Sequence, residues 1–229
     1  MDKLEWGSEH VLFDDNLTAR LADLLLSLRP GQKLESEREL AQRLGVSRTA
    51  LRDRLVQFEA LGIVERRTGS GTFVKGFSPD SVSLSLSLGL RNSGVSTESL
   101  VSVRVALERQ AAREAAATQD LVALAHVAVA AKAMSETNDE ALLLKADIDF
   151  HRAVFEASKS PSLIFFAEAL NGTLARSVSG RQQRIWRLKH DIPKIRELHW
   201  EIYRQMAAGS ELGAMAAMDA HFDWLEDID

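Results

Sequence analysis

Three histidines and one aspartate in the second half of the chain are residue types that bind metal ions. Asp147 and His151 are four residues apart, so on a helix both side chains lie on one face. His199 and His221 lie in later segments whose apolar neighbours would make an unpaired imidazole costly. Three imidazoles and a carboxylate suit a borderline divalent cation, and we expect zinc, with nickel or manganese as alternatives.

The spacing alone does not show that these four residues meet. An aspartate and a histidine one helical turn apart also form an ordinary polar contact on a helix surface, and that interpretation stays open. The other histidines, His10, His126 and His190, have no comparable neighbours and are interpreted as structural.

A second group of residues, nearer the N-terminus, could read DNA. Arg48 and Arg52 are also four residues apart, and an arginine in the major groove can donate two hydrogen bonds to guanine O6 and N7. The hydroxyls of Ser47 and Thr49 suit phosphate contacts, and Arg38 could reach the backbone of the duplex. The alternative is a small helical domain whose arginines are simply solvated.

These arginines need a helix-turn-helix to present them, and the sequence predicts one. Apolar residues recur at helical spacing over residues 15–28. Ser36 and Glu39 form a capping box that starts a second helix. Gly45 suits the left-handed turn that ends this helix, and Ser47 caps a third. In this plan the start of the third helix enters the major groove.

A wing is predicted after the third helix. Residues 63–67 and 72–74 have the composition of two short strands joined by a turn. The turn contains Gly69, Ser70 and Gly71, and its glycines let the main chain approach the minor groove closely.

The fold class is expected to be mainly α, with a winged helix-turn-helix at 1–76, a connector at 77–96 and an all-helical body at 97–229. Leucines in the connector alternate mainly with serines, a strand-like period for which no partner strand is predicted, and a helix is the alternative. The body is rich in alanine and leucine, and predicts six or seven helices packed as an antiparallel bundle. Breaks between its helices are expected near residues 118, 138, 160–161, 179–180 and 209.

Composition limits the function classes. The net charge is -5 over 229 residues, and residues 1–76 contain twelve basic and twelve acidic side chains. Any DNA contact must therefore come from a local basic face. The absence of cysteine excludes disulfides and cysteine-type zinc sites. No stretch approaches the roughly 18 apolar residues of a membrane span, so we expect a soluble, cytoplasmic protein with no membrane partner.

The N-terminal segment LESERELAQRLGVSRTALRDRLVQFEALGIVERRTGSGTFV resembles the DNA-binding domain of the GntR family of regulators. The resemblance implies that DNA is contacted by Arg38, Arg48 and Arg52, assisted by Ser47 and Thr49, with Gly69, Ser70 and Gly71 near the minor groove. Two residues depart from the family pattern. Glu35 stands where a proline is usual, which could loosen the turn before the second helix, and Asp53 stands where a glutamate is usual.

The body is similar to the FCD effector domain of the FadR branch of this family, through VRVALERQAAREAA, DIDFHRAVFEAS, LHWEIYRQMAAG and AMAAMDAHF. Metal-binding members use one aspartate and three histidines in these motifs, which implies Asp147, His151, His199 and His221 here. A family arginine that resembles a carboxylate clamp corresponds to Arg104, for which an ion pair with Glu108 is the alternative role. Asn171 and Arg176 are weaker candidates for an effector pocket.

The expected function is an effector-responsive transcriptional regulator, with a repressor favoured. A homodimer would bind double-stranded DNA at a near-palindromic operator, and a small organic acid would bind at the metal in the helical body. One alternative is a metal-dependent hydrolase whose head is a DNA tether, although no His-Glu-x-x-His motif is present. Another is a regulator whose metal is purely structural.

Overall fold

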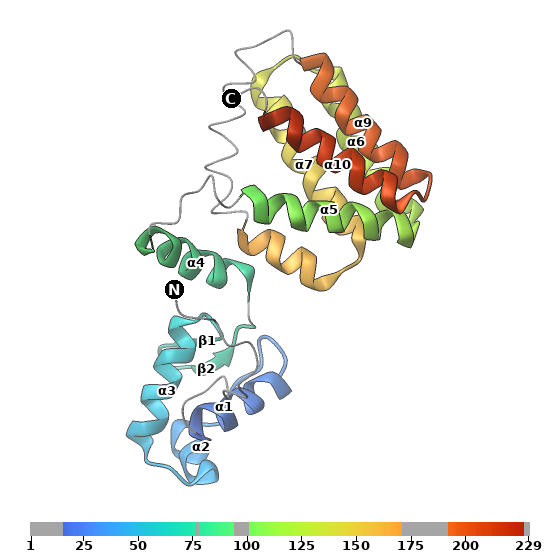
Figure 1. Ribbon diagram of the computed structural model, residues 1–229. Helices are drawn as coiled ribbons and strands as arrows, with labels where there is room; N and C mark the ends of the chain where they lie inside the picture. The colour runs from blue at the N-terminus through green and yellow to red at the C-terminus, as the bar shows by residue number, and fades with distance from the viewer. Residues whose placement is uncertain (1–15, 77, 94–100, 171–191, 227–229) are drawn as a thin grey trace, which may run out of the picture. The chain divides into compact units, whose positions relative to one another are not determined.

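The computed structural model describes residues 16–76, 78–93, 101–170 and 192–226. The chain divides into two compact units after Ser81, which we call the head and the body (Figure 1).

Three helices form most of the head: α1 (Asn16–Ser27), α2 (Glu37–Leu44) and α3 (Arg48–Ala60). The predicted capping box is present at the start of α2, where the Glu39 amide donates to Ser36 Oγ and the Ser36 amide donates to the Glu39 carboxylate. Gly45 ends the helix at φ 68°, a left-handed conformation that suits glycine. The helix-turn-helix is thus set by local signals.

The wing consists of β1 (Val64–Arg67) and β2 (Gly71–Val74), which pair antiparallel. Val64 lies opposite Val74 and Arg67 opposite Gly71, so the turn falls at residues 68–70, and Gly71, which was predicted in the turn, begins β2. Lys33 forms an isolated bridge with Phe73, which ties the segment before α2 to the wing.

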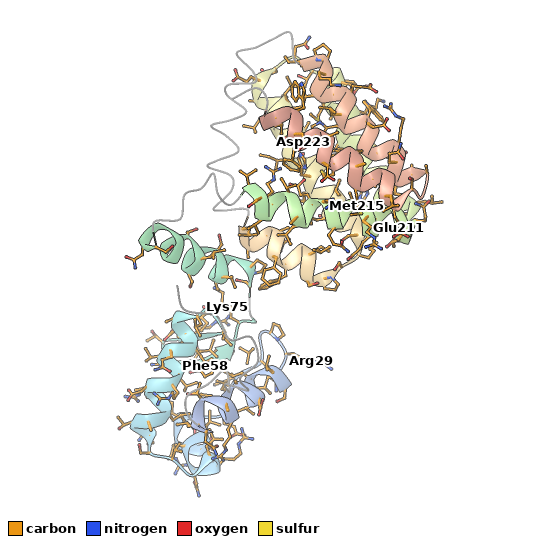
Figure 2. All side chains as sticks on the ribbon, viewed as in Figure 1. Arg29, Phe58, Lys75, Glu211, Met215 and Asp223 are labelled. Atoms are coloured by element: carbon orange, nitrogen blue, oxygen red, sulfur yellow. The ribbon has the colours of Figure 1, made fainter. Side chains whose placement is uncertain are left out.

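One buried apolar cluster joins the helices of the head to its wing. Figure 2 shows the side chains of the head, among them Phe58 on α3. The cluster contains Leu21, Ala22, Leu25, Leu34, Leu40, Ala41, Leu44, Leu51, Leu55, Phe58, Val64 and Val74. Because every described element of the head contributes to it, the cluster holds the start of α3 at a fixed orientation within the head.

The expected connector contains helix α4 (Pro79–Asn92), which settles the choice between strand and helix. An isolated strand would leave its backbone groups unpaired, whereas a helix satisfies them within the segment. Leu86 of α4 also packs with Leu107 and Leu170, so at least one of the alternating leucines has apolar neighbours elsewhere in the body.

The body is all helical in the part of the chain that the structure describes. It contains α5 (Val101–Thr118), α6 (Leu121–Glu136), α7 (Glu140–Ser158), a helical segment at 161–170, α9 (Ile192–Ala207) and α10 (Glu211–Glu226). The breaks expected near residues 118, 138, 160–161 and 209 fall between these helices. The one expected at 179–180 lies outside the described residues.

Helix α5 packs against α7, α9 and α10 (Figure 1). Its buried face is mostly alanine: Ala111, Ala112 and Ala115 are completely buried. Small side chains let neighbouring helices approach closely, so residues of α5 and α7 that lie near this face can reach one another. This packing positions the buried polar side chains of the body.

Candidate metal centre and DNA-binding surface

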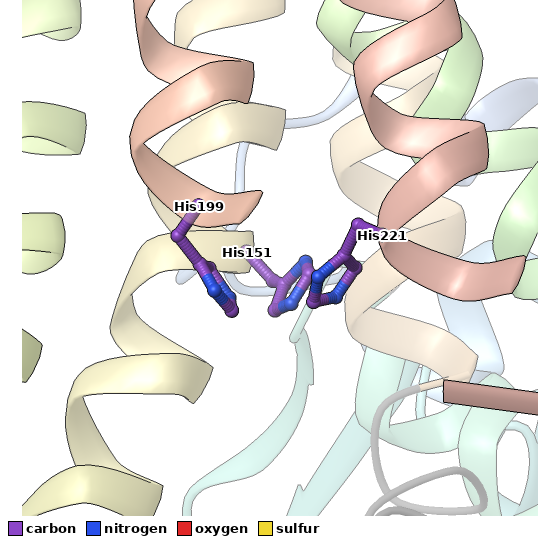
Figure 3. Close-up of side chains that lie close together, drawn as sticks. All are labelled: His151, His199 and His221. Carbon is purple, nitrogen blue, oxygen red and sulfur yellow. The ribbon is translucent and has the colours of Figure 1, made fainter. Parts of the chain in front are cut away.

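The three predicted histidine ligands converge inside the body. His151 lies on α7, His199 on α9 and His221 on α10, and each offers a ring nitrogen within 4.8 Å of the others (Figure 3). All three side chains are buried. Three separate helices thus bring nitrogen donors to one point.

Asp147, the fourth predicted ligand, lies beside two of the three histidines. Its Oδ1 lies 3.0 Å from His199 Nε2 and 3.8 Å from His151 Nε2. The carboxylate is also buried. The surface-contact interpretation of the Asp147–His151 pair is therefore wrong, because both residues face the interior of the bundle.

Two of the ring nitrogens are buried without a hydrogen-bond partner among the described residues: His199 Nε2 and His221 Nδ1. The Asp147 carboxylate lies 3.0 Å from His199 Nε2, which is an ion-pair distance. Each unsatisfied buried polar atom costs about 1–3 kcal/mol, which a bound cation would offset. The donor set of three imidazoles and a carboxylate therefore fits a divalent transition metal.

The protonation of His199 also suits a ligand role. Its Nδ1 lies 2.7 Å from the backbone carbonyl of Ile195, one turn earlier on α9. Only a protonated nitrogen can donate to a carbonyl, so Nδ1 carries the hydrogen and, in the neutral ring, Nε2 keeps its lone pair. That lone pair points toward the cluster that a metal would occupy.

Glu108 on α5 is part of the candidate site, although the sequence did not predict it there. It is almost fully buried and accepts a hydrogen bond from His151 Nδ1 at Oε2. Its Oε1 accepts from Arg104 Nε at 2.5 Å. The only signal in the sequence was its position one turn after Arg104, which suggested an ion pair and nothing about a histidine.

The electrostatics keep the carboxylates ionised. Burial raises the pKa of Asp147, but the nearby His199, His151 and Arg104 more than offset this effect and lower it to about 2. Burial likewise raises the pKa of Glu108, and Arg104 and His151 lower it to about 2.

The charged form of one histidine is disfavoured. Burial, followed by the neighbouring His199 and His151, lowers the pKa of His221 well below 6.5. A neutral imidazole beside ionised carboxylates is the protonation state that metal ligands require.

The candidate effector residues are only partly described. Arg104 forms the ion pair with Glu108, and its guanidinium lies 5.4 Å from the centre of the Phe222 ring. Its carboxylate-clamp role stays a prediction. Asn171 and Arg176 lie outside the described residues.

The candidate DNA-binding residues gather at the start of α3. Ser47, Arg48 and Thr49 are exposed there, and the Ser47 hydroxyl accepts from the Ala50 amide as the helix N-cap. Arg38 is exposed at the start of α2, and no hydrogen bond or ion pair of Arg38 or Arg48 occurs within the described residues. These side chains are accessible to a ligand.

Arg52 has an intramolecular partner that the sequence did not reveal. Its Nε and Nη2 both donate to Glu37 Oε2 on α2, at 3.1 and 2.7 Å. The Arg52 side chain is nevertheless half exposed. The pair joins the two helices of the motif.

The wing turn is exposed as well. Gly69, Ser70 and Gly71 all lie at the surface, and both glycines have positive φ, 71° and 109°. Such backbone is strained for other residues, so the turn depends on its glycines.

The two departures from the family pattern leave these features intact. Glu35 pairs with Arg43 at 3.1 Å on the surface, and the capping box that follows it is complete. Asp53 is exposed next to Arg52.

No helix in the described ranges is both long and apolar enough to cross a membrane.

Comparisons with known proteins agree with this geometry. The model of the GntR family of bacterial regulatory proteins matches residues 14–74, and that of the FCD domain matches residues 99–223. The two matches cover the head and most of the body in the expected order.

Curated relatives are similar over most of their length. The HTH-type transcriptional regulator LutR of Bacillus subtilis is 34% identical, over 88% of this chain and 93% of the relative. A putative L-lactate dehydrogenase operon regulatory protein of Escherichia coli is 28% identical, over 87% and 78%. The Glc operon transcriptional activator of the same species is 31% identical, over 77% and 72%.

A solved structure has the same fold. The Streptococcus agalactiae GntR protein superposes with a TM-score of 0.68, at 23% identity, over 92% of this chain and 98% of that one. These relatives are regulators, which removes the hydrolase alternative. The chain belongs to the GntR family of bacterial regulatory proteins and is a FadR-type transcriptional regulator with a C-terminal FCD domain, not an enzyme.

Proposed function

We propose that this regulator is a repressor of a catabolic operon that leaves its operator when a small organic acid binds at a metal in the body. A homodimer would place two heads on the half-sites of a near-palindromic operator, because two-fold symmetry in the protein matches two-fold symmetry in the DNA. We assign DNA reading to residues 1–76, connection to 77–96, and effector binding and dimerisation to 97–229.

The observation that carries the proposal is the buried cluster of His151, His199 and His221, with the Asp147 carboxylate 3.0 Å from His199 Nε2. A bundle gains nothing from burying unsatisfied imidazole nitrogens unless something binds them. These four residues would hold the cation, with zinc expected and nickel or manganese as alternatives.

A bound cation would supply a positive charge and an open coordination position for a carboxylate oxygen. Residues of this chain would make the other contacts with the acid. Arg104 lies close enough to the cluster to lower the pKa of Asp147, and its guanidinium is a second positive group for an acid. Asn171 and Arg176 remain candidates for the same pocket.

The names of two relatives indicate which acids to test first. One is named a putative L-lactate dehydrogenase operon regulatory protein and another a Glc operon transcriptional activator. From these names we infer that the present chain prefers a small polar acid. A metal and an arginine also suit a carboxylate better than an acyl chain.

The test measures operator binding with and without the acid. Fluorescence anisotropy would follow zinc-loaded protein on labelled DNA from upstream of its own gene, with L-lactate and other small hydroxy acids and dicarboxylates. The expected result is a loss of affinity of about 5- to 150-fold with the correct acid, the usual range of allosteric coupling. The His199→Gln, His221→Gln double variant should bind DNA but lose the response.

His126→Gln is the matched control, because His126 is an exposed histidine on α6 away from the cluster. If the double variant kept the full acid response, the metal would be structural and the sensory part of the proposal wrong. If the acid strengthened operator binding, the proposal that the acid releases the protein from DNA would be wrong.

A further inference from the structure

We propose that Glu108 is a positioning residue that holds His151 in the tautomer a metal needs and holds Arg104 inside the bundle. The metal part of this inference rests on the proposed function. Its structural part rests only on two contacts of Glu108 and on its burial.

Glu108 uses each carboxylate oxygen for a different partner. Oε2 accepts from His151 Nδ1 on α7, and Oε1 accepts from Arg104 Nε one turn earlier on α5. The carboxylate is 1% exposed, so water does not replace either partner. A buried carboxylate is stable only while it is paired, which makes the arrangement of the three side chains mutually dependent.

The contact with His151 determines which ring nitrogen faces the cluster. Because Nδ1 donates to Glu108, the neutral ring keeps its lone pair on Nε2, the atom that lies 3.8 Å from Asp147 Oδ1. A carboxylate behind a histidine also fixes the ring plane and makes the imidazole a stronger ligand. Loss of such a partner typically weakens metal binding by about 10- to 100-fold.

The contact with Arg104 fixes the second positive group of the site. Only 17% of the Arg104 side chain is exposed, and Glu108 is the partner that the described residues provide for its Nε. The same carboxylate therefore connects the candidate acid clamp to a candidate metal ligand. A change at either one is transmitted to the other through one side chain rather than through a helix movement.

Metal titration of variants tests the first contact. Zinc affinity would be measured by calorimetry with a competing chelator for the wild-type chain, Glu108→Gln and Glu114→Gln. Glu114 lies on the same helix and accepts a hydrogen bond from Gln110, so its variant makes the same chemical change away from the cluster. We expect about 10- to 100-fold weaker binding for Glu108→Gln and less than twofold change for Glu114→Gln. Equal affinities for all three proteins would overturn the proposal.

A second measurement needs no metal. Nitrogen-15 NMR of the metal-free wild-type protein distinguishes the two neutral tautomers of His151, and we expect the proton on Nδ1. The Arg104 Nε–H should be protected from exchange in the wild type and lose that protection in Glu108→Gln. A proton on His151 Nε2, or an unprotected Arg104 Nε–H in the wild type, would contradict the inference.

The two measurements separate this inference from the proposed function. If the wild type binds no metal but His151 has its proton on Nδ1, the proposal of a sensory metal is wrong. The proposed role of Glu108 in orienting His151 then stands. If metal binds tightly and His151 has the other tautomer, the proposed function stands and the role of Glu108 is wrong.

Discussion

The head and the body place their candidate residues in opposite surroundings. Arg38, Arg48 and Thr49 of the head are exposed, whereas His199 and Asp147 of the body are 0% and 4% exposed. Exposed charges contribute little to folding, while buried polar groups destabilise the fold when they lose a partner. DNA binding in the head should therefore be separable from stability, whereas ligand binding in the body should be coupled to it.

The largest effect is expected from removing the two arginines that we propose to read bases. The Arg48→Ala, Arg52→Ala double variant should bind operator DNA at least about 30-fold more weakly, because each arginine can provide one bidentate contact to guanine. Its thermal midpoint should stay within about 2 °C of the wild type, since both side chains are exposed. Anisotropy and thermal melting check the two parts.

Arg152→Ala is the charge-matched control, because Arg152 is exposed on α7 and pairs only with Glu156 among the described residues. Equal operator affinity for the double variant and the control would show that the start of α3 does not read DNA. A large loss of stability in the double variant would break the separation between binding and folding in the head.

The body should show the opposite coupling when the proposed metal is removed. Zinc at about 100 times its dissociation constant stabilises a protein by about 2.7 kcal/mol, so a chelator should lower the melting temperature of the body by about 5–10 °C. The chelator should lower the melting temperature of His126→Gln as much as that of the wild type. It should leave the melting temperature of His199→Gln unchanged. A wild-type protein that is unaffected by the chelator would contradict a metal at this site.

The head could be predicted from sequence because its signals are local. The Ser36–Glu39 box, Gly45 and Ser47 lie within a dozen residues, and each has a direct backbone role in the structure. Helix α4 was ambiguous, because alternating leucines fit both a strand and a helix. Its partners, such as Leu107 and Leu170 beside Leu86, lie far along the chain.

The candidate metal centre was only partly predictable for the same reason. The spacing of Asp147 and His151 is local. The convergence of His151 with His199 and His221 depends on how three helices pack, and it was predicted only from the family resemblance. The role of Glu108 was missed, because its contact with His151 spans 43 residues between α5 and α7. Periodicity predicts which face of a helix is buried, not which buried polar groups meet.

A smaller effect is expected from pH, and it should arise in the body. The pKa of His221 is well below 6.5 in the folded chain, so below pH 6.5 the unfolded chain binds a proton that the folded chain does not. The metal-free protein should lose about 1.4 kcal/mol of stability per pH unit as pH falls from about 6.5. Asp147 and Glu108, whose folded pKa is about 2, add a loss in the same direction only below about pH 4.

Chemical unfolding of the metal-free protein between pH 7.5 and 5 measures this dependence. His221→Asn should flatten it, whereas His126→Asn, a change at an exposed histidine, should leave it unchanged. The same slope in His221→Asn and the wild type would show that another group is responsible. Among the described residues, the buried charged side chains and histidines all belong to the body, so the head should not contribute.

The smallest effect tests whether the head also uses a prearranged ion pair, as the body does. Glu37 holds Arg52 in the free protein, and it is a negative charge close to the surface that would meet phosphates. Since an exposed pair is weak, Glu37→Gln should release Arg52 at little cost and tighten operator binding by about two- to fivefold. Asp23→Asn, which removes an exposed charge on α1, should change the affinity by less than about twofold. Weaker binding by Glu37→Gln in anisotropy titrations would mean that the pair orients Arg52 for guanine, and that both units depend on a carboxylate that positions an arginine.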